Sequence, residues 1–509
     1  MSRVNKLRHD LTQLPLFLMM FGMGAVSMFV PATYALLADR HGASQAFFYA
    51  GLLGTVTCLL IGVAHAGRPT RQSPLGPLLS LLSAFVFLPA VFAVPVVETL
   101  PTTRFFNAYF EMLSALTTTG ATLFDDPARL SPTLHLWRAQ VGWMGGLLMW
   151  VAAVAILAPL NLGGFEVTAQ AEPGRQETGL YTNAPSSPRR RILRALRTLA
   201  PLYAGLTILL WVLLVISGQE PFGAICHAMS VMATSGITAG GDAASGGVIA
   251  EIVMAMFMLF ALSRLTFSSD TITATQGGLR TDPEFRIGLG IIALVPLVLF
   301  LRHFSGAIDL DKGQSVLSAI RALWGSVFTV ISFLSTTGFV SEHWSETQSW
   351  SGLRTPGMIL MGLALVGGGV ATTAGGVKLL RVFALYLNGV REMERLVHPS
   401  SVSGAGLVGR RLQSGGAFIA WIFFMLFALS FAAVTLALSL VGVSFDEALV
   451  LSIAMLSTTG PLTEVGGESP ISLMALGDSA KAILAGAMIL GRLETLAIIA
   501  LLTPDLWRS

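Results

Sequence analysis

Long apolar runs and short polar connections alternate along almost the whole chain of 509 residues. A helix that crosses a lipid bilayer needs about 20 mostly apolar residues. Runs of about that length occupy ten ranges, which are 14–38, 44–65, 75–97, 137–160, 199–217, 248–268, 286–302, 355–388, 414–441 and 479–502. The pattern therefore predicts an all-α membrane protein with about ten membrane-spanning helices.

A shorter apolar segment lies between the two members of four successive pairs of these runs. The four segments are Phe105–Leu116, Phe222–Met232, Val316–Leu334 and Ala448–Leu456. Most are around a dozen residues long, which is too short to cross a bilayer, and each is followed by hydroxyl residues and a glycine. Non-helical backbone at membrane depth is tolerated only where protein buries it or where it lines a water-filled cavity. We therefore predict four re-entrant half-helices that enter the membrane partway and turn back.

The turn after each half-helix is similar in all four copies. Its residues are Thr118, Thr119 and Gly120, then Thr234, Ser235 and Gly236, then Thr336, Thr337 and Gly338, and finally Thr458, Thr459 and Gly460. The glycines lie roughly 100–120 residues apart, well beyond the periods of solenoid repeats. The unit is a helix, a half-helix (or pore helix) with its turn, and a second helix, repeated four times around one pseudo-fourfold pore. The predicted boundaries are 1–70 for an N-terminal helix pair and 71–170, 198–272, 284–392 and 410–509 for pore repeats one to four.

Composition agrees with a location in lipid. Only 12% of the residues are charged, against roughly a quarter in an average soluble domain, and the mean hydropathy is +0.72. The net charge of +3 is too small to indicate a nucleic-acid partner. Cys58 and Cys226 lie in apolar surroundings far apart, so we expect neither a disulfide nor a metal or redox motif. The first apolar run has no evident small-residue cleavage site and is expected to be a retained helix.

Basic residues concentrate in alternate connections, which predicts the topology. One set of connections holds Arg3, Lys6 and Arg8; Arg68 and Arg71; Arg175, Arg189, Arg190, Arg191, Arg194 and Arg197; Arg280 and Arg286; and Arg391, Arg395, Arg410 and Arg411. The other set, beside the four turns, holds Asp125, Asp126, Asp242, Glu342, Glu346, Glu464 and Glu468 with few bases. The positive-inside rule places the first set and both termini in the cytoplasm. The four half-helices then enter from outside.

A half-helix that ends in a hydroxyl–glycine turn suits a cation. The C-terminus of a helix carries about half a negative elementary charge, and backbone carbonyls can replace the hydration shell of a potassium ion. Glycine allows the backbone angles that turn successive carbonyls toward one axis. Acidic residues suit the opposite ends of the half-helices, where Glu220, Asp446 and Glu447 lie. A single Thr-Gly could equally be an ordinary helix cap, but four copies at equivalent places favour a filter.

Further motifs accompany the turns over nearly the whole chain. They are Leu136–Arg138 and Val141–Gly146, Ala171–Gly174, Gly367–Gly369 with Thr373–Lys378, and Leu490–Glu494 with Thr503–Arg508. With the four turns they resemble the Trk/Ktr/HKT superfamily of potassium transporters, and within it the TrkH/TrkG membrane subunits. The additional N-terminal helix pair is similar to TrkH and unlike the shorter Ktr subunits.

The resemblance implies an ion, a location and partners. In this superfamily a glycine in all four turns accompanies potassium, and a serine in the first accompanies sodium, so Gly120 implies potassium, bound at the twelve turn residues named above. Two positions depart from the family pattern without changing the backbone chemistry: Ile237, where an aromatic residue is frequent, and the turn before Pro461, where asparagines often precede the glycine. The resemblance also implies a bacterial inner (plasma) membrane protein that forms a homodimer and binds a TrkA-like cytoplasmic nucleotide-binding regulatory subunit. This chain has no nucleotide motif, and no cofactor is expected in it.

A glycine-rich stretch in repeat three predicts a gate. Each glycine destabilises a helix interior by about 1 kcal/mol, so a continuous helix is improbable between residues 367 and 376. By resemblance this stretch is an intramembrane loop beneath the filter that opens and closes the pore. Its predicted residues are Gly367, Gly368, Gly369, Thr372, Thr373, Gly375 and Gly376, together with Arg492 of the last span. The alternative for the glycines is close helix packing through small residues.

The charged residues near membrane depth have two interpretations each. A charge in mid-span costs about 2.5–3.5 kcal/mol on insertion scales, so Arg492 must face water or a partner. By resemblance it is a positive barrier below the filter, and the alternative is a structural ion pair with Glu494 or Glu111. Glu111 is expected to brace the filter from behind. Lys378 and Arg381 are expected to be anchors at the inner membrane boundary, and the cluster 189–197 is either a topology signal or a contact for lipid headgroups.

The leading hypothesis is a potassium-translocating, channel-like subunit with one pore per chain. A second hypothesis is a sodium- or proton-coupled secondary transporter, which should show twofold pseudo-symmetry and an ion-coupling carboxylate in mid-span. Here the repeat is fourfold, and Glu494 is the one isolated acid found in mid-span. An intramembrane enzyme is disfavoured because no paired catalytic acids and no His-Glu-x-x-His or Gly-x-Ser-x-Gly motif occur.

Overall fold

The computed structural model describes residues 16–65, 76–160, 188–240, 245–263, 282–306, 316–353, 356–397 and 416–493, and these residues are helical with no strands. Several predictions fall outside this range, among them the motif Ala171–Gly174, Asp242, Arg280, Arg410, Arg411, Glu494 and the segment Thr503–Arg508. The all-α class predicted from hydropathy is confirmed.

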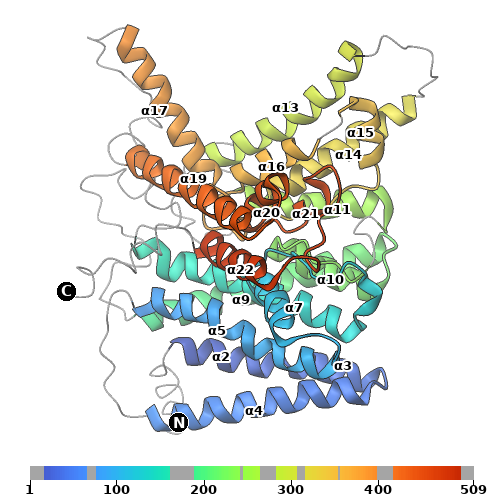
Figure 1. Ribbon diagram of the computed structural model, residues 1–509, viewed down its shortest axis with the longest axis vertical. Coiled ribbons are helices and arrows are strands. Elements are labelled where there is room, and N and C mark those ends of the chain that lie inside the picture. The colour runs from blue at the N-terminus through green and yellow to red at the C-terminus, as the bar shows by residue number, and fades with distance from the viewer. Residues whose placement is uncertain are drawn as a thin grey trace.

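The chain begins with a pair of long helices outside the repeats. Helices α2 (Leu16–Ser27) and α3 (Phe29–Leu37) form one nearly continuous span, and α4 (His41–His65) returns beside it. Figure 1 shows this pair at the lower edge of the molecule. The close approach of α2 and α4 depends on small residues, since a Cβ atom at Gly54 would lie 2.8 Å from that of Ala25.

Each repeat then contributes a first helix, a half-helix and a second helix. Repeat one has α5 (Gly76–Thr99), α6 (Phe105–Leu116) and α7 (Pro132–Ala152), and repeat two has α9 (Pro188–Ile216), α10 (Pro221–Ala233) and α11 (Gly247–Met258). Repeat three has α13 (Pro283–Gly306), α14 (Val316–Leu334), α15 (Trp344–Ser351), α16 (Gly357–Val366) and α17 (Leu379–Val397). Repeat four has α19 (Gly416–Leu440), α20 (Phe445–Leu456), α21 (Leu462–Val465) and α22 (Asp478–Leu493).

Local sequence explains where these helices begin. Pro132 and Pro221 occupy the first turn of α7 and α10, where the missing N–H costs nothing. Helix α20 begins after Ser444, whose hydroxyl accepts a hydrogen bond from the Glu447 N–H. The half-helices α10 and α20 therefore have conventional starts, and their unusual feature is how they end.

Eight helices of the described residues are long and apolar enough to cross a membrane. They include α14 (19 residues), which nevertheless ends in the same turn as the three shorter half-helices. The runs expected at 248–268 and 355–388 appear as shorter apolar helices, Gly247–Leu262 and Gly357–Val366. The second of these helices ends at Val366, directly before the glycines that predicted a break. Cys58 and Cys226 are both free thiols, as expected.

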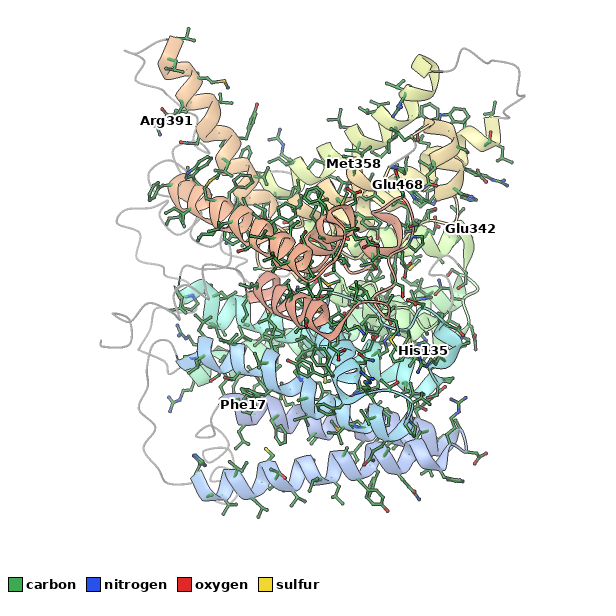
Figure 2. The ribbon with its side chains drawn as sticks, viewed as in Figure 1. Phe17, His135, Glu342, Met358, Arg391 and Glu468 are labelled. Atoms are coloured by element: carbon green, nitrogen blue, oxygen red, sulfur yellow. The ribbon has the colours of Figure 1, made fainter. Side chains whose placement is uncertain are left out.

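The long helices run roughly side by side, so the molecule has two opposite faces. Figure 2 shows Glu342 and Glu468 on one of these faces and Arg391 toward the other. A buried aromatic group ties the N-terminal pair to repeat one: the Trp137 ring meets Phe47 and Phe92 edge-on at centroid distances of 5.5 and 5.4 Å. Its indole N–H donates to the carbonyl of Phe92 at 3.2 Å. The helix pair is thus packed against the repeats rather than loosely attached.

Candidate functional site

All four half-helices end in the same backbone motif. In repeat one the Thr119 N–H donates to the Ser114 carbonyl at 2.9 Å and the Thr118 N–H to the Ala115 carbonyl at 2.9 Å, which is the Schellman pattern. The bond equivalent to that from Thr119 to Ser114 is found in each other repeat. There the backbone N–H of the first residue donates to the carbonyl of the second: Ser235 to Ser230 at 2.9 Å, Thr337 to Ser332 at 2.9 Å and Thr459 to Ala454 at 2.8 Å. The four ends are therefore true structural repeats.

A threonine occupies the left-handed position of each motif, where glycine is usual. The φ angles are 54° at Thr118, 51° at Thr234, 59° at Thr336 and 54° at Thr458. For a β-branched residue this conformation is a genuine outlier, and such strain costs about 1–3 kcal/mol per residue. Strain of this kind clusters at functional sites, and here it recurs at four equivalent positions.

The glycines of the four turns meet in a closed ring. A Cβ atom added to any of them would come closer than 3.0 Å to a neighbouring repeat, a distance that real Cβ atoms essentially never show. The collisions are Gly120 with the Ser235 carbonyl, Gly236 with the Thr337 carbonyl, Gly338 with the Pro461 ring, and Gly460 with the Ala121 nitrogen. Each repeat thus touches the next, and the fourth touches the first.

Repeat four departs from the other three at the glycine itself. Gly120, Gly236 and Gly338 have φ values of 74°, 67° and 86°, whereas the φ of Gly460 is not positive. Pro461 restricts the residue before it, and it also begins the turn of α21. The Gly460 N–H donates to the Thr119 carbonyl at 2.6 Å. The expectation that the fourth turn keeps the backbone chemistry of the others is therefore wrong at Gly460.

The threonine hydroxyls of the turns are buried polar groups. Thr118 and Thr458 are 0% and 1% exposed, and within the described residues the Oγ1 atoms of both lack a hydrogen-bond partner. A buried hydroxyl without a partner costs about 1–3 kcal/mol. Oxygen atoms in this state are available to a cation.

The loop at Gly367–Gly376 interrupts the second helix of repeat three. Helix α16 ends at Val366 and α17 begins at Leu379. The loop is closed at its base by two backbone bonds, from Val377 N–H to the Leu365 carbonyl at 2.8 Å and from Lys378 N–H to the Val366 carbonyl at 2.9 Å. The alternative of a continuous helix packed through small residues is excluded by this geometry.

The loop packs directly against the ends of the half-helices. The Gly375 N–H donates to Thr336 Oγ1 at 2.8 Å, and a Cβ atom at Gly375 would collide with the Ser457 carbonyl. Thr373 Oγ1 reaches the Met232 carbonyl at 3.5 Å, while Thr372 Oγ1 donates within the loop to the Gly369 carbonyl at 2.7 Å. One loop therefore contacts three of the four half-helix ends.

Neighbouring segments hold the other side of the loop. The Gly369 N–H donates to the Ala261 carbonyl at 2.9 Å, and the Val370 N–H donates to Glu284 Oε1 at 3.1 Å. Glu284, at the start of α13, is 1% exposed. Gly368 also lies against Ala261, too close for a side chain. The loop is thus gripped between the half-helices and the ends of two further helices.

Arg492 lies where the resemblance implies. Its side chain is 4% exposed, and its Nη1 donates to the Thr373 carbonyl of the loop at 2.7 Å. Glu111 does not pair with it, and Glu494 lies outside the described residues. Within the structure, the last helix is joined to the loop by a charge-assisted hydrogen bond.

Glu111 braces the first turn, as expected. One carboxylate oxygen accepts a hydrogen bond from the Leu123 N–H at 3.0 Å, three residues past Gly120. The other lies 2.6 Å from Arg138 Nε in an ion pair whose side chains are 2% and 9% exposed. The carboxylate therefore holds the turn from behind and is neutralised by α7.

Two basic residues after the loop are placed differently from expectation. Lys378 and Arg381 are 6% and 0% exposed, so the prediction that they anchor the chain at the membrane boundary is wrong. Arg381 lies over the Phe423 ring at 3.6 Å from its centroid, and Lys378 Nζ donates to the Ala374 carbonyl. Cation–π and carbonyl contacts from the loop and from α19 keep these cations inside the protein.

Sequence reasoning missed two buried acids near the site. Glu251 on α11 is 0% exposed and Glu284 on α13 is 1% exposed, and both accept hydrogen bonds from the third repeat. Each lies close to the end of an apolar run, where an acid reads as a boundary residue. Glu251 lies in the first turn of the run predicted at 248–268, and Glu284 lies two residues before the run predicted at 286–302. An acid inside or directly before the first turn of a predicted span was the available signal.

A small cavity lies beside the loop. It offers about 20 Å³ of space to water-sized molecules, and its lining includes Trp150, Tyr203, Thr234, Thr372 and Thr373. A site needs about 10–15 Å³ to hold a water molecule. The second turn and the loop hydroxyls therefore share a space large enough for one.

The fold and site define an integral membrane protein in which four half-helices bring their turns into one ring that packs against an irregular loop. A family model described as "TrkH: Cation transport protein" matches residues 93–507. The chain belongs to the TrkH family of cation transport proteins. The resemblance stated from the motifs is confirmed.

Individual relatives match over almost their full length. The "Trk system potassium uptake protein TrkH" of Vibrio parahaemolyticus is 31% identical over 502 residues, which cover 96% of this chain and 98% of the relative. That of Halomonas elongata is 31% identical over 519 residues, covering 99% and 100%. The crystal structure of the potassium transporter TrkH from Vibrio parahaemolyticus superimposes with a TM-score of 0.77 at 26% identity, covering 97% of this chain and 99% of that one.

Proposed function

We propose that this chain is the potassium-translocating membrane subunit of a Trk-type uptake system. The observation that carries the proposal is the ring in which each turn glycine touches the next repeat. A ring of four repeated turns favours one passage per chain, and the relatives are named potassium uptake proteins. Because those relatives are transporters, we expect transport and not catalysis.

The chemistry of the ring favours a dehydrated cation. Four half-helices direct their negative C-terminal ends to one region, and backbone carbonyls such as those of Ser235 and Thr337 lie at the closest approach between repeats. The buried hydroxyls of Thr118 and Thr458 add oxygen atoms. Oxygens at these positions would replace the water shell of the ion, and a glycine at position 120 is expected with potassium.

The loop Gly367–Gly376 is the proposed gate. It contacts three half-helix ends, and Arg492 holds it through the Thr373 carbonyl. A loop in that place has to move before an ion can leave the ring on this side. The arginine also sets a positive charge close to the ion path, which opposes cation passage while the loop is closed.

Coupling of flux to sodium or protons is the alternative. It predicts a twofold arrangement and a carboxylate free to bind the coupled ion. The fourfold ring, and the binding of Glu111 and Glu251 to fixed donors, support channel-like flux instead.

Assembly and location form part of the proposal. We expect a homodimer in the bacterial inner membrane, with both termini in the cytoplasm and a TrkA-like subunit bound there. The nucleotide that regulates transport would bind that subunit, and potassium is the cargo of this chain. Copurification of the cognate regulatory subunit with the detergent-solubilised protein tests the partnership.

The central test is rubidium and sodium flux into liposomes that contain the full chain. Gly120→Ala should abolish rubidium flux or its preference over sodium, because the added Cβ would collide with the Ser235 carbonyl. Gly223→Ala, in a neighbouring half-helix where a Cβ atom would meet nothing within 4 Å, is the matched control. A Gly120→Ala variant with the rubidium flux and the rubidium-to-sodium ratio of the wild type would refute the proposal.

A further inference from the structure

Glu251 is a fully buried acid on α11, the second helix of repeat two. Its carboxylate accepts hydrogen bonds from three donors: Trp324 Nε1 at 2.7 Å, Ser341 Oγ at 2.9 Å and the Glu342 N–H at 2.8 Å. All three donors belong to repeat three. The side chain therefore joins two repeats at a place that the proposed ion path does not itself use.

The position of the donors shows what Glu251 holds. Ser341 and Glu342 follow Gly338, the third turn glycine, by three and four residues. The Glu251 carboxylate therefore binds the chain where it leaves the ring. Trp324 lies on α14, the half-helix that enters the same turn. Glu251 thereby holds the chain that leaves the third turn and joins it to α14, ten residues before the end of that half-helix.

Repeat one has a brace of the same kind with a different construction. Glu111 accepts from Leu123, also three residues past its glycine, but it comes from the half-helix of the same repeat and pairs with Arg138. The acid that holds the third turn, Glu251, is supplied by the neighbouring second repeat. The three hydrogen-bond donors to Glu251 among the described residues are neutral. Ring positions one and three are thus both held by buried carboxylates.

We propose that Glu251 is a positioning residue that sets the selectivity of the ring by holding its third turn from the adjacent repeat. This inference rests on the proposed function, in which the four turns form the potassium filter. We take the ring to select by cavity size, so that it prefers the larger ion while its oxygens are held apart. A third turn released from Glu251 could close around sodium.

The chemistry of the donors suggests a specific substitution. Three donors converge on two carboxylate oxygens, and glutamine offers one acceptor oxygen and an NH₂ group that would face a donor. Glu251→Gln preserves the shape of the side chain and breaks at least one of the three bonds. Glu468→Gln removes an exposed carboxylate and is the matched control.

The experiment measures rubidium and sodium flux into liposomes containing the full chain. Glu251→Gln should lower the ratio of rubidium to sodium flux by about fivefold or more, the effect of one unsatisfied buried donor, and Glu468→Gln should not change it. An unchanged ratio in Glu251→Gln would overturn the inference. Absence of selective flux in the wild type would instead refute the proposed function.

Two further variants keep the inference testable if Glu251→Gln does not fold. Trp324→Phe and Ser341→Ala each delete one donor and leave the carboxylate in place. Each should lower the flux ratio in the same direction, and combining them should have less than the product of the two effects, because both act through one carboxylate. A ratio that neither variant changes would contradict the role of Glu251.

Discussion

Replacing Gly375 by alanine should open the proposed gate. This glycine is buried against the fourth half-helix, and a Cβ atom there would collide with the carbonyl oxygen of Ser457 and with Thr458 Oγ1. Neither atom can move easily, because Ser457 is 0% and Thr458 1% exposed within the ring. The loop is the part that has to yield, and it must move away from the half-helices.

The size of the effect follows from the bonds that this movement breaks. Gly375 N–H donates to Thr336 Oγ1 at 2.8 Å, and a neutral bond of this kind contributes about 1 kcal/mol. If the movement also separates the Thr373 carbonyl from Arg492, now 2.7 Å apart, a bond to a charged group worth about 1.5–3 kcal/mol is lost as well. A loss of about 1 kcal/mol, for the first bond alone, to about 4 kcal/mol, for both, raises the fraction of open loops about 5-fold to nearly 1,000-fold.

Rubidium flux into liposomes measures this directly. Gly375→Ala should transport faster than the wild type without regulatory subunit, while its preference for rubidium over sodium stays the same. Gly362→Ala, on the helix that leads into the loop, is the matched control because a Cβ atom there would meet nothing within 4 Å. If Gly375→Ala transports at the wild-type rate, or more slowly with the same amount of folded protein, the loop does not close the pore.

Two more predictions concern buried acids. Glu284→Ala leaves the Val370 N–H without its acceptor and should raise rubidium flux. Glu284→Gln keeps an acceptor oxygen and should raise the flux less. Equal flux in both variants and the wild type would argue that Glu284 does not hold the loop. Glu111→Gln or Arg138→Met alone breaks a buried ion pair and should lower the free energy of unfolding by about 3–5 kcal/mol. Thermal unfolding in detergent should show the double variant recovering most of that loss, and a double variant as unstable as the sum of the single ones would contradict the pairing.

The half-helices and the break in repeat three could be predicted because their signals are local. A short apolar run followed by hydroxyls and a glycine marks a half-helix, and Phe105–Leu116 and Val316–Leu334 have the predicted limits to the residue. Five glycines between 367 and 376 cannot sustain a helix. The boundaries of the repeats as domains stay a prediction.

Contacts between repeats could not be predicted, because they join residues that are distant in the sequence. Glu251 and Ser341 are separated by 90 positions, and no periodicity relates them. Arg381 looked like a boundary anchor because its neighbours in sequence are at the end of an apolar run. Its burial against Phe423 depends on how α17 crosses α19, which hydropathy does not encode.

The ring itself shows how one local residue changes a repeated design. Four similar helix ends predict four equivalent carbonyls, but Pro461 disfavours the helical region for the residue before it and precedes α21 as its N-cap. The Thr459 carbonyl accepts from the Leu462 N–H at 3.1 Å, and the Gly460 N–H is left to donate to the Thr119 carbonyl at 2.6 Å. Of the four carbonyls that precede the turn glycines, those of Thr119 and Thr459 thus accept hydrogen bonds from backbone donors.

The carbonyls of Ser235 and Thr337 differ from that engaged pair. Among the described residues they accept no hydrogen bond, and each faces the glycine of the preceding repeat. A cation in the ring would therefore meet two unengaged backbone oxygens, from repeats two and three, and two that already accept a hydrogen bond. Because Glu251 holds repeat three from repeat two, the brace and the unengaged oxygens lie on the same side of the ring. The selectivity of a ring built in this way should depend more on repeats two and three than its fourfold sequence pattern implies.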